Sequence, residues 1–287
     1  MKQRISNWKK RLERERVYND LLTPAGIGNS VIRKKATKPF PVAVDGITNP
    51  IVCPFEFNRN FTLIAPHTTT TLTKIGNSAT SSGTISHPAV GDVHGHMANF
   101  ATGAVAANRA GTGNASVMWV RGATAVGLSG FLFYARVAFP DADYDESGVG
   151  TGSRIFVGLT SGTMAASVSD INPAGHLLGF QRVSEEGVGT HTNWQFIGKD
   201  GTDIEYNDTG LVFTPERTYE FYIYAKPMFT EVHYSIKEII LGSEASGSIN
   251  TFLPGASDYL RSGFQLETID AVSRNIRTGL VYTSTLK

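Results

Sequence analysis

The sequence predicts an all-β protein: a two-sheet antiparallel β-sandwich, preceded by a short N-terminal helix and an extended linker. The first observation is a regular alternation of apolar and polar side chains in segments 131–139, 219–226 and 231–237, which is typical of half-buried strands. The second is a series of further strand-like runs, separated by clusters of Gly, Asn, Asp and Ser, at 154–160, 176–183, 193–198, 259–269 and 276–283. The third is the near absence of helical periodicity between these runs, which excludes a parallel α/β fold and favours two packed sheets.

The N-terminal segment differs from the rest of the chain in charge. In residues 1–38, eleven Lys and Arg stand against three acidic residues, a net charge of +8, whereas the remainder carries −7. Within residues 3–22, Ile5, Trp8 and Leu12 follow a spacing of three and then four, which predicts one apolar face of a helix. A lone helix of this length is marginal in water, so we expect it to need a partner.

These patterns divide the chain into three parts. We expect residues 1–50 to form a basic helix and linker, 51–128 an irregular β-rich region or subdomain, and 129–287 the main β-sandwich. No run approaches the roughly 20 apolar residues of a membrane helix, and the N-terminus lacks the apolar core of a secretory signal. We therefore expect that the protein does not insert into a membrane. We also expect that it is made in the cytoplasm of the producing cell.

A set of framework segments runs through the C-terminal half: Ser129–Arg136, Arg154–Thr160, Gly179–Phe180, Thr192–Phe196, Asp200–Gly201, Thr218–Tyr224, Arg274–Asn275 and Leu280–Thr283. Their pattern resembles a lectin-like module of phage tail-fibre and appendage proteins, especially those of phages that infect Bacteroidetes. The resemblance covers slightly more than half of the chain and contains no catalytic signature. It implies a concanavalin-like jelly roll that is usually trimeric and is exposed on a virion.

Three aromatic residues are candidates for glycan binding, because exposed rings on a sandwich face can stack on sugars. They are Trp194, Tyr222 and Tyr224. Trp194 alternates with Phe196, so the two side chains point the same way, and the pattern favours their burial over display. Tyr222 and Tyr224 lie opposite Phe221, where a subunit interface, a glycan site and simple packing all stay open.

Two positions are candidates for metal binding, and at each the alternative is a loop that binds no metal. In Asp92-Val-His94-Gly-His96, the His94 and His96 side chains would share one face of a strand and could provide two metal ligands. The segment 141–146 carries alternating Asp residues of the kind that bind Ca²⁺, but it lacks the EF-hand spacing. We expect no cofactor.

No catalytic set is recognisable, and we expect the protein not to be an enzyme. Glycosidases of this architecture need two converging carboxylates. Glu220 shares a face with Tyr222 and Tyr224, and Glu267 lies near Asp270, but neither has a known catalytic spacing. No phosphate-binding loop, nucleophile elbow or zinc cluster is present either.

The basic helix is the candidate anchor for a partner protein. Ile5, Trp8 and Leu12 would enter an apolar groove, while Lys9 and Arg11 would surround the contact. Nucleic acid is a weaker candidate partner, because acidic residues are interleaved with the basic ones. A merely disordered basic tail is the remaining alternative.

Together these features predict a bacteriophage virion structural protein of tail-fibre, appendage or head-fibre type. We expect a homotrimer, located in the virion, whose N-terminus binds other virion proteins and whose sandwich binds a host-surface glycan or a virion protein. The alternative is a secreted carbohydrate-binding or polysaccharide-degrading β-sandwich protein. The missing secretory signal and the missing catalytic spacing count against that alternative.

Overall fold

The computed structural model describes twelve segments of the chain, all within one compact unit, Asn60–Lys287. The described residues are 61–66, 72–75, 79–82, 84–86, 97–114, 130–145, 152–162, 175–185, 189–190, 192–225, 230–255 and 258–285. Every regular element among them is a strand. None of these residues belongs to a helix long and apolar enough to cross a membrane. The predicted helix with Ile5, Trp8, Lys9, Arg11 and Leu12 lies outside the described residues.

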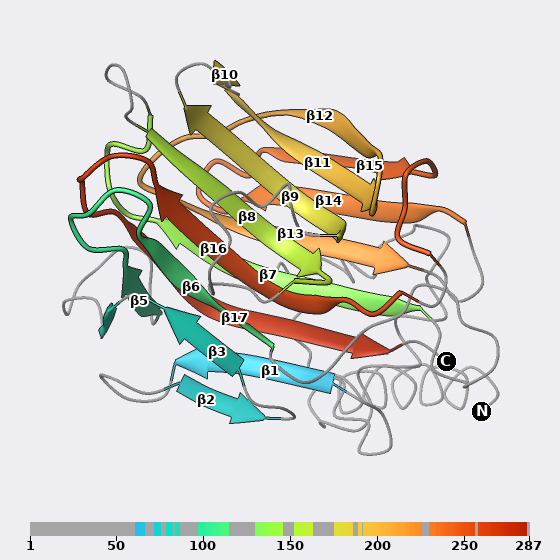
Figure 1. Cartoon of the computed structure of the whole chain (residues 1–287), viewed down its shortest axis with the longest axis horizontal. Helices are drawn as coiled ribbons and strands as arrows, with labels where there is room; N and C mark the ends of the chain where they lie inside the picture. The colour runs from blue at the N-terminus through green and yellow to red at the C-terminus, as the bar shows by residue number, and fades with distance from the viewer. Residues whose placement is uncertain are drawn as a thin grey trace, which may run out of the picture. The chain divides into compact units, whose positions relative to one another are not determined.

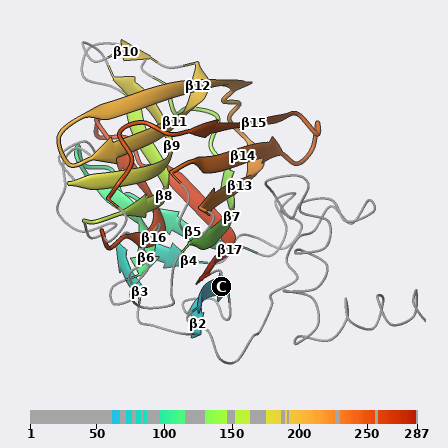
Figure 2. The same ribbon diagram turned by 90° about the vertical axis from the view of Figure 1, so that its right-hand side faces the viewer.

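The strands form two antiparallel sheets that pack face to face (Figures 1 and 2). Sheet A has the order β15-β14-β13-β7-β17-β1-β2, with β5 paired to β17 and β4 to β5. Its strands are β1 (Phe61–Pro66), β2 (Leu72–Ile75), β4 (Thr84–Ser86), β5 (Ala98–Ala101), β7 (Phe131–Phe139), β13 (Arg217–Ala225), β14 (Val232–Glu238), β15 (Glu244–Ile249) and β17 (Asn275–Thr285).

Sheet B has the order β12-β11-β9-β8-β16-β6-β3, with β10 paired to β9. Its strands are β3 (Ala79–Ser82), β6 (Arg109–Asn114), β8 (Gly152–Thr160), β9 (His176–Glu185), β10 (Gly189–Thr190), β11 (Asn193–Asp200), β12 (Ile204–Val212) and β16 (Arg261–Thr268). The described strands between residues 61 and 114 are thus hydrogen-bonded into the same two sheets as the C-terminal strands.

The predicted all-β fold of two antiparallel sheets is confirmed. Each of the eight strand-like segments of the sequence corresponds to a strand, from β7 to β17. Three strands from β7 to β17 were not predicted: the two-residue β10 and the longer β12 and β15. The strands β12 and β15 are edge strands whose side chains are largely exposed, so they carry little of the apolar alternation that marks a half-buried strand.

An aromatic cluster fills the space between the sheets. Trp194 is fully buried, and its ring centroid lies 5.1 Å from that of Phe221 and 5.5 Å from those of Phe213 and Tyr219. Phe139 reaches the same cluster from β7, with its ring centroid 5.6 Å from that of Trp194. These rings come from both sheets and the β12–β13 connection, so they join the two layers through edge-to-face and tilted contacts.

Strand register defines two ends of the sandwich. At one end Phe139 pairs with Arg217, and Thr268 pairs with Ser153; we call it the Arg274 end. At the opposite end Thr160 pairs with both Arg261 and Leu177; we call it the Tyr259 end. The start of β1 and the end of β17 lie at the Tyr259 end, on the right in Figure 1, because Phe61 pairs with Ser284.

Replacement of Trp194 tests the role of this cluster. Trp194→Ala should lower the free energy of unfolding by about 3–5 kcal/mol, because it removes a fully buried ring and leaves a cavity between the sheets. Tyr259→Ala, at a position that is 60% exposed, is the matched control and should change stability by about 0.5 kcal/mol or less. Denaturant unfolding followed by circular dichroism measures both; equal losses would mean that Trp194 does not hold the sheets together.

Candidate functional site

The aromatic residues predicted for glycan binding lie in different environments. Trp194 belongs to the core described above. Tyr222 is on the outer face of sheet A but is only 2% exposed, and its ring centroid lies 4.9 Å from that of Tyr134 on the adjacent strand. Tyr224 keeps a half-buried ring next to His233. Of the three, only Tyr224 offers part of its ring to solvent.

Glu220 forms a buried polar cluster with two tyrosines. The Tyr134 hydroxyl donates to Oε1 at 3.0 Å and the Tyr222 hydroxyl donates to Oε2 at 3.2 Å, so both carboxylate oxygens accept a hydrogen bond. Burial, with the nearby Glu220 charge, raises the pKa of both tyrosines far above the ordinary range. Both hydroxyls therefore remain protonated donors at any pH at which the protein is used.

Glu220 and Glu267, which the sequence singled out separately for acid–base chemistry, lie on opposite outer faces of the sandwich and so belong to different sites. Glu220 alternates with core residues of sheet A, whereas Glu267 alternates with core residues of sheet B. Glu267 is bound by Arg109 at 2.8 Å and Arg154 at 3.1 Å, one from each neighbouring strand. A glycosidase pair must lie within about 10 Å across one bond, and two groups separated by the thickness of a sandwich cannot act in that way.

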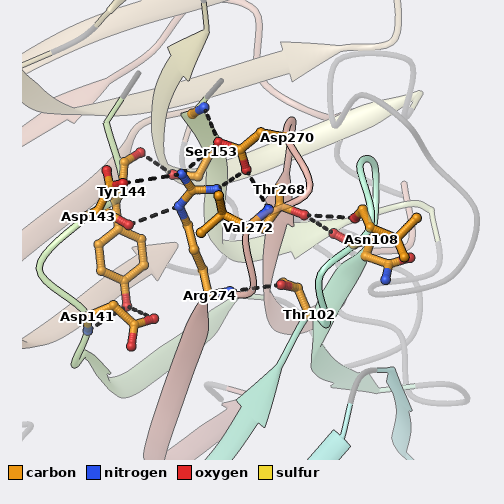
Figure 3. Close-up of polar contacts among 12 residues, drawn as sticks. Thr102, Asn108, Asp141, Asp143, Tyr144, Ser153, Thr268, Asp270, Val272 and Arg274 are labelled. Atoms are coloured by element: carbon orange, nitrogen blue, oxygen red, sulfur yellow. Dashed lines mark hydrogen bonds and ion pairs between the residues drawn. The ribbon is translucent and has the colours of Figure 1, made fainter. Parts of the chain in front are cut away.

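At the Arg274 end, a buried arginine holds two loops together (Figure 3). Arg274 is 1% exposed. Its guanidinium donates to both carboxylate oxygens of Asp270, and its Nε donates to the backbone carbonyl of Asp143 at 2.9 Å. Its backbone N–H donates to the Thr102 hydroxyl at 3.0 Å. The fork of five donors in arginine suits this convergence of carboxylate and carbonyl oxygens.

A second buried arginine supports the same acidic loop. Arg182 donates to the Tyr144 carbonyl at 3.2 Å, pairs with the Asp145 carboxylate, and stacks over Phe213 at 4.5 Å from the ring centroid. Burial lowers the pKa of Arg182 to about 10, so it stays charged at neutral pH. Guanidinium groups thus bind carbonyl and carboxylate oxygens of the loop after β7.

No other metal arrangement is found in the described segments. They contain no group of three or more His, Cys, Asp or Glu residues placed to hold a metal ion. His94 and His96 lie outside these segments, so the structure gives no geometry for that pair.

Exposed apolar side chains separate by type between the two ends. At the Arg274 end they are aliphatic: Val105, Val212, Ile240, Leu241 and Val272. Towards the Tyr259 end they are aromatic: Tyr206 on β12, Phe252 after β15 and Tyr259 before β16. We call Tyr206, Phe252 and Tyr259 the aromatic end set.

Phe252 is held in a strained conformation. Its side chain is 43% exposed and its backbone φ is 44°, in the left-handed region that bulky residues seldom adopt. The adjacent Thr251 hydroxyl donates to the Glu205 carboxylate, and the Phe252 carbonyl lies so close to Gly198 that a Cβ there would be 3.2 Å from it. These contacts fix the ring at the surface of the β11–β12 hairpin.

The other side of the same connection is fixed to β9. The Asp258 carboxylate accepts from the backbone N–H of Gly255 and lies 3.4 Å from Nδ1 of His176. His176 in turn donates its backbone N–H to the Ser161 hydroxyl at 2.9 Å. Tyr259, next to Asp258, therefore projects from an anchored position, with carboxylates beside an exposed ring.

Sequence patterns did not single out the aromatic end set. The one local signal is Pro254-Gly255, which indicates a turn soon after Phe252. Tyr206 is in a strand that lacks apolar alternation, and Tyr259 precedes the buried Leu260 as any outward-facing strand residue would.

Acid titration tests the Arg274 site. Burial alone would raise the pKa of Asp270, but hydrogen bonds from Arg274, Gly152 and Val272 outweigh it and lower the pKa below the ordinary value. The folded pKa is therefore below the unfolded one, near 4, and the stabilisation is present above that pH and is lost as pH falls through the folded pKa. At neutral pH, the Asp270→Asn variant should have a lower melting temperature than the unchanged protein. On acidification, its melting temperature should fall by less than that of the unchanged protein. Parallel melting curves from neutral pH to about pH 3 would contradict this.

Comparisons with known proteins agree with this architecture. No protein-family model and no curated protein matches the sequence. The fold is similar to a protein of unknown function from Shewanella oneidensis MR-1, with a TM-score of 0.53 and 12% identity over 78% of this chain and 85% of that one. It is also similar to peanut lectin, solved with a 9mer peptide, with a TM-score of 0.52 and 11% identity over 80% of this chain and 99% of that one. The chain therefore has a lectin-like β-sandwich fold.

Proposed function

We propose that the protein binds carbohydrate through the aromatic end set. The observation that carries the proposal is the exposure of Tyr206, Phe252 and Tyr259 towards one end of a lectin-like sandwich, with Phe252 held there in a strained conformation. Aromatic rings stack on the apolar faces of sugars, while neighbouring carboxylates accept sugar hydroxyls. Backbone strain persists where the surrounding structure imposes it, and it gathers at binding sites.

The second part of the proposal concerns the biological setting. The framework pattern of the C-terminal half supports a phage appendage protein that assembles as a homotrimer and presents its sandwich to the host surface. The basic segment with Trp8 and Leu12 supports attachment to another virion protein. The protein would then act without catalysis, since Glu220 and Glu267 are both held by other side chains and cannot converge.

A secreted carbohydrate-binding protein is the rival proposal, and it uses the same site. The phage proposal and the rival proposal differ in where the protein is found. Only a virion protein co-purifies with infectious particles through the final density gradient. The aromatic end set is compatible with both.

Two variants at Phe252 and Tyr259 test carbohydrate binding. Phe252→Gly and Tyr259→Ala should each weaken retention on host polysaccharide by about fivefold or more, as expected for loss of a stacked ring worth about 1 kcal/mol or more. Leu241→Ala removes an apolar side chain that is 70% exposed at the opposite end, and is the control that should bind normally. Affinity electrophoresis in polysaccharide gels measures all three.

The Phe252 variant also separates binding from folding. Glycine relieves the left-handed backbone, worth about 1–2 kcal/mol, against an entropic cost of about 0.5–1 kcal/mol. The melting temperature should therefore stay the same or rise while binding falls. Loss of binding together with a large fall in melting temperature would instead mean that Phe252 serves the fold.

Deletion of residues 1–22 tests the anchor. The truncated protein should keep its melting temperature, because the described compact unit begins at Asn60, but should fail to enter particles. Trp8→Ala should reduce incorporation more than Lys9→Ala or Arg11→Ala, as measured by immunoblotting of purified phage. A larger effect of the single charge changes, growing with added salt, would indicate an electrostatic contact instead.

A further inference from the structure

We propose that the aromatic end set selects uncharged or amine-bearing oligosaccharides and rejects polyanionic ones. This inference rests on the proposed carbohydrate function and adds the chemical class of the ligand. The rings form the binding surface, and the charges around them decide which sugars approach it.

Fixed charge at the Tyr259 end is predominantly negative among the described residues. Five acidic residues lie in the strands and turns of this end, against the basic Lys199 and Arg261; the acids are Asp200, Asp203, Glu205, Glu231 and Asp258. With histidines neutral, these seven described residues carry a net charge of −3. A polymer with a carboxylate on every sugar would bring many like charges within one Debye length, about 10 Å at 0.1 M salt.

Two of these carboxylates are held in place beside the rings. Oδ1 of Asp200 accepts the backbone N–H groups of Thr202 and Asp203, both at 2.9 Å. These hydrogen bonds lower the pKa of Asp200, so it remains ionised in weakly acidic surroundings. Asp258 is fixed by Gly255 and His176 and precedes the exposed Tyr259 directly. Both are positioned to accept sugar hydroxyls or a sugar ammonium group.

The spacing of the rings indicates the length of the ligand. Tyr206 is on β12, whereas Tyr259 leads into β16; the Phe252 carbonyl lies next to Gly198 on β11. Four strand spacings separate β12 from β16 in the order β12-β11-β9-β8-β16, which is about 19 Å at the usual distance between strands. One sugar ring cannot reach both Tyr206 and Tyr259, so a ligand that contacts the whole set is an oligosaccharide segment.

The experiment compares acidic polysaccharides with their own carboxyl-reduced forms, which keep the linkages and lose the charge. The panel contains the host capsule, polygalacturonate and hyaluronan, with chitosan oligomers as the amine-bearing probe, at low and physiological salt. We expect the full chain to bind at least one carboxyl-reduced polysaccharide or the chitosan oligomers. It should bind the acidic form of each polysaccharide at least tenfold more weakly than the reduced form at low salt. The double variant Asp203→Asn/Asp258→Asn should narrow that difference several-fold.

A charge-matched control is available at the Arg274 end. The double variant Glu216→Gln/Glu244→Gln removes two exposed carboxylates there. It should leave the difference in binding between acidic and carboxyl-reduced glycans unchanged, and this result would exclude an effect of net charge alone. Equal or tighter binding of the acidic forms, or an equal response of the two double variants, overturns the selectivity inference while leaving carbohydrate binding intact. Failure of every glycan to bind, with a normal melting temperature, overturns the proposed function as well.

Discussion

The structure depends on the contact between aromatic side chains of its two sheets. Trp194 on β11 meets Tyr219 and Phe221 on β13 with ring centroids about 5 to 6 Å apart, a range in which edge-to-face contacts are favourable. Because these rings are rigid and large, they fix the separation of the layers and the position of β13 relative to β11. The ends of the strands, and hence the loops that carry the candidate site, take their places from this contact.

Two buried arginines stabilise the Arg274 end. The acidic loop after β7 brings carboxylate and backbone carbonyl oxygens to the place where strands of both sheets end. Asp143 and Asp145 stay more than half exposed, so the buried charges are the guanidinium groups, and a buried charge without partners is very costly. Arg182 from β9 and Arg274 from the turn before β17 find these partners in the loop, and their hydrogen bonds and ion pairs hold this end together.

Much of the fold could be predicted from the sequence, because half-buried strands such as β7, β13 and β14 alternate apolar residues, which face the core, with polar residues on the other face. The edge strand β15 was not predicted, because Ser246 and Gly247 interrupt any alternation of apolar and polar residues.

The candidate site was not predicted for a different reason. Phe252 and Tyr259 are brought to one end by a connection between sheets, and no local pattern encodes that path. Arg182 and Arg274 look like ordinary surface residues in sequence, yet long-range contacts bury both. Trp194 was a candidate for glycan binding but is buried in the core, as its alternation with Phe196 predicted.

The pairing of β1 with β17 has a practical consequence. Phe61 and Ser284 are cross-strand partners, so the start of β1 and the end of β17 lie side by side at the Tyr259 end. Neighbouring ends of this kind allow circular permutation. A chain closed by a short link between β17 and β1, and opened at the exposed turn of Leu241 and Gly242, would carry its tether at the opposite end. The aromatic rings would then point away from any surface to which the protein is attached, which suits an immobilised glycan sensor.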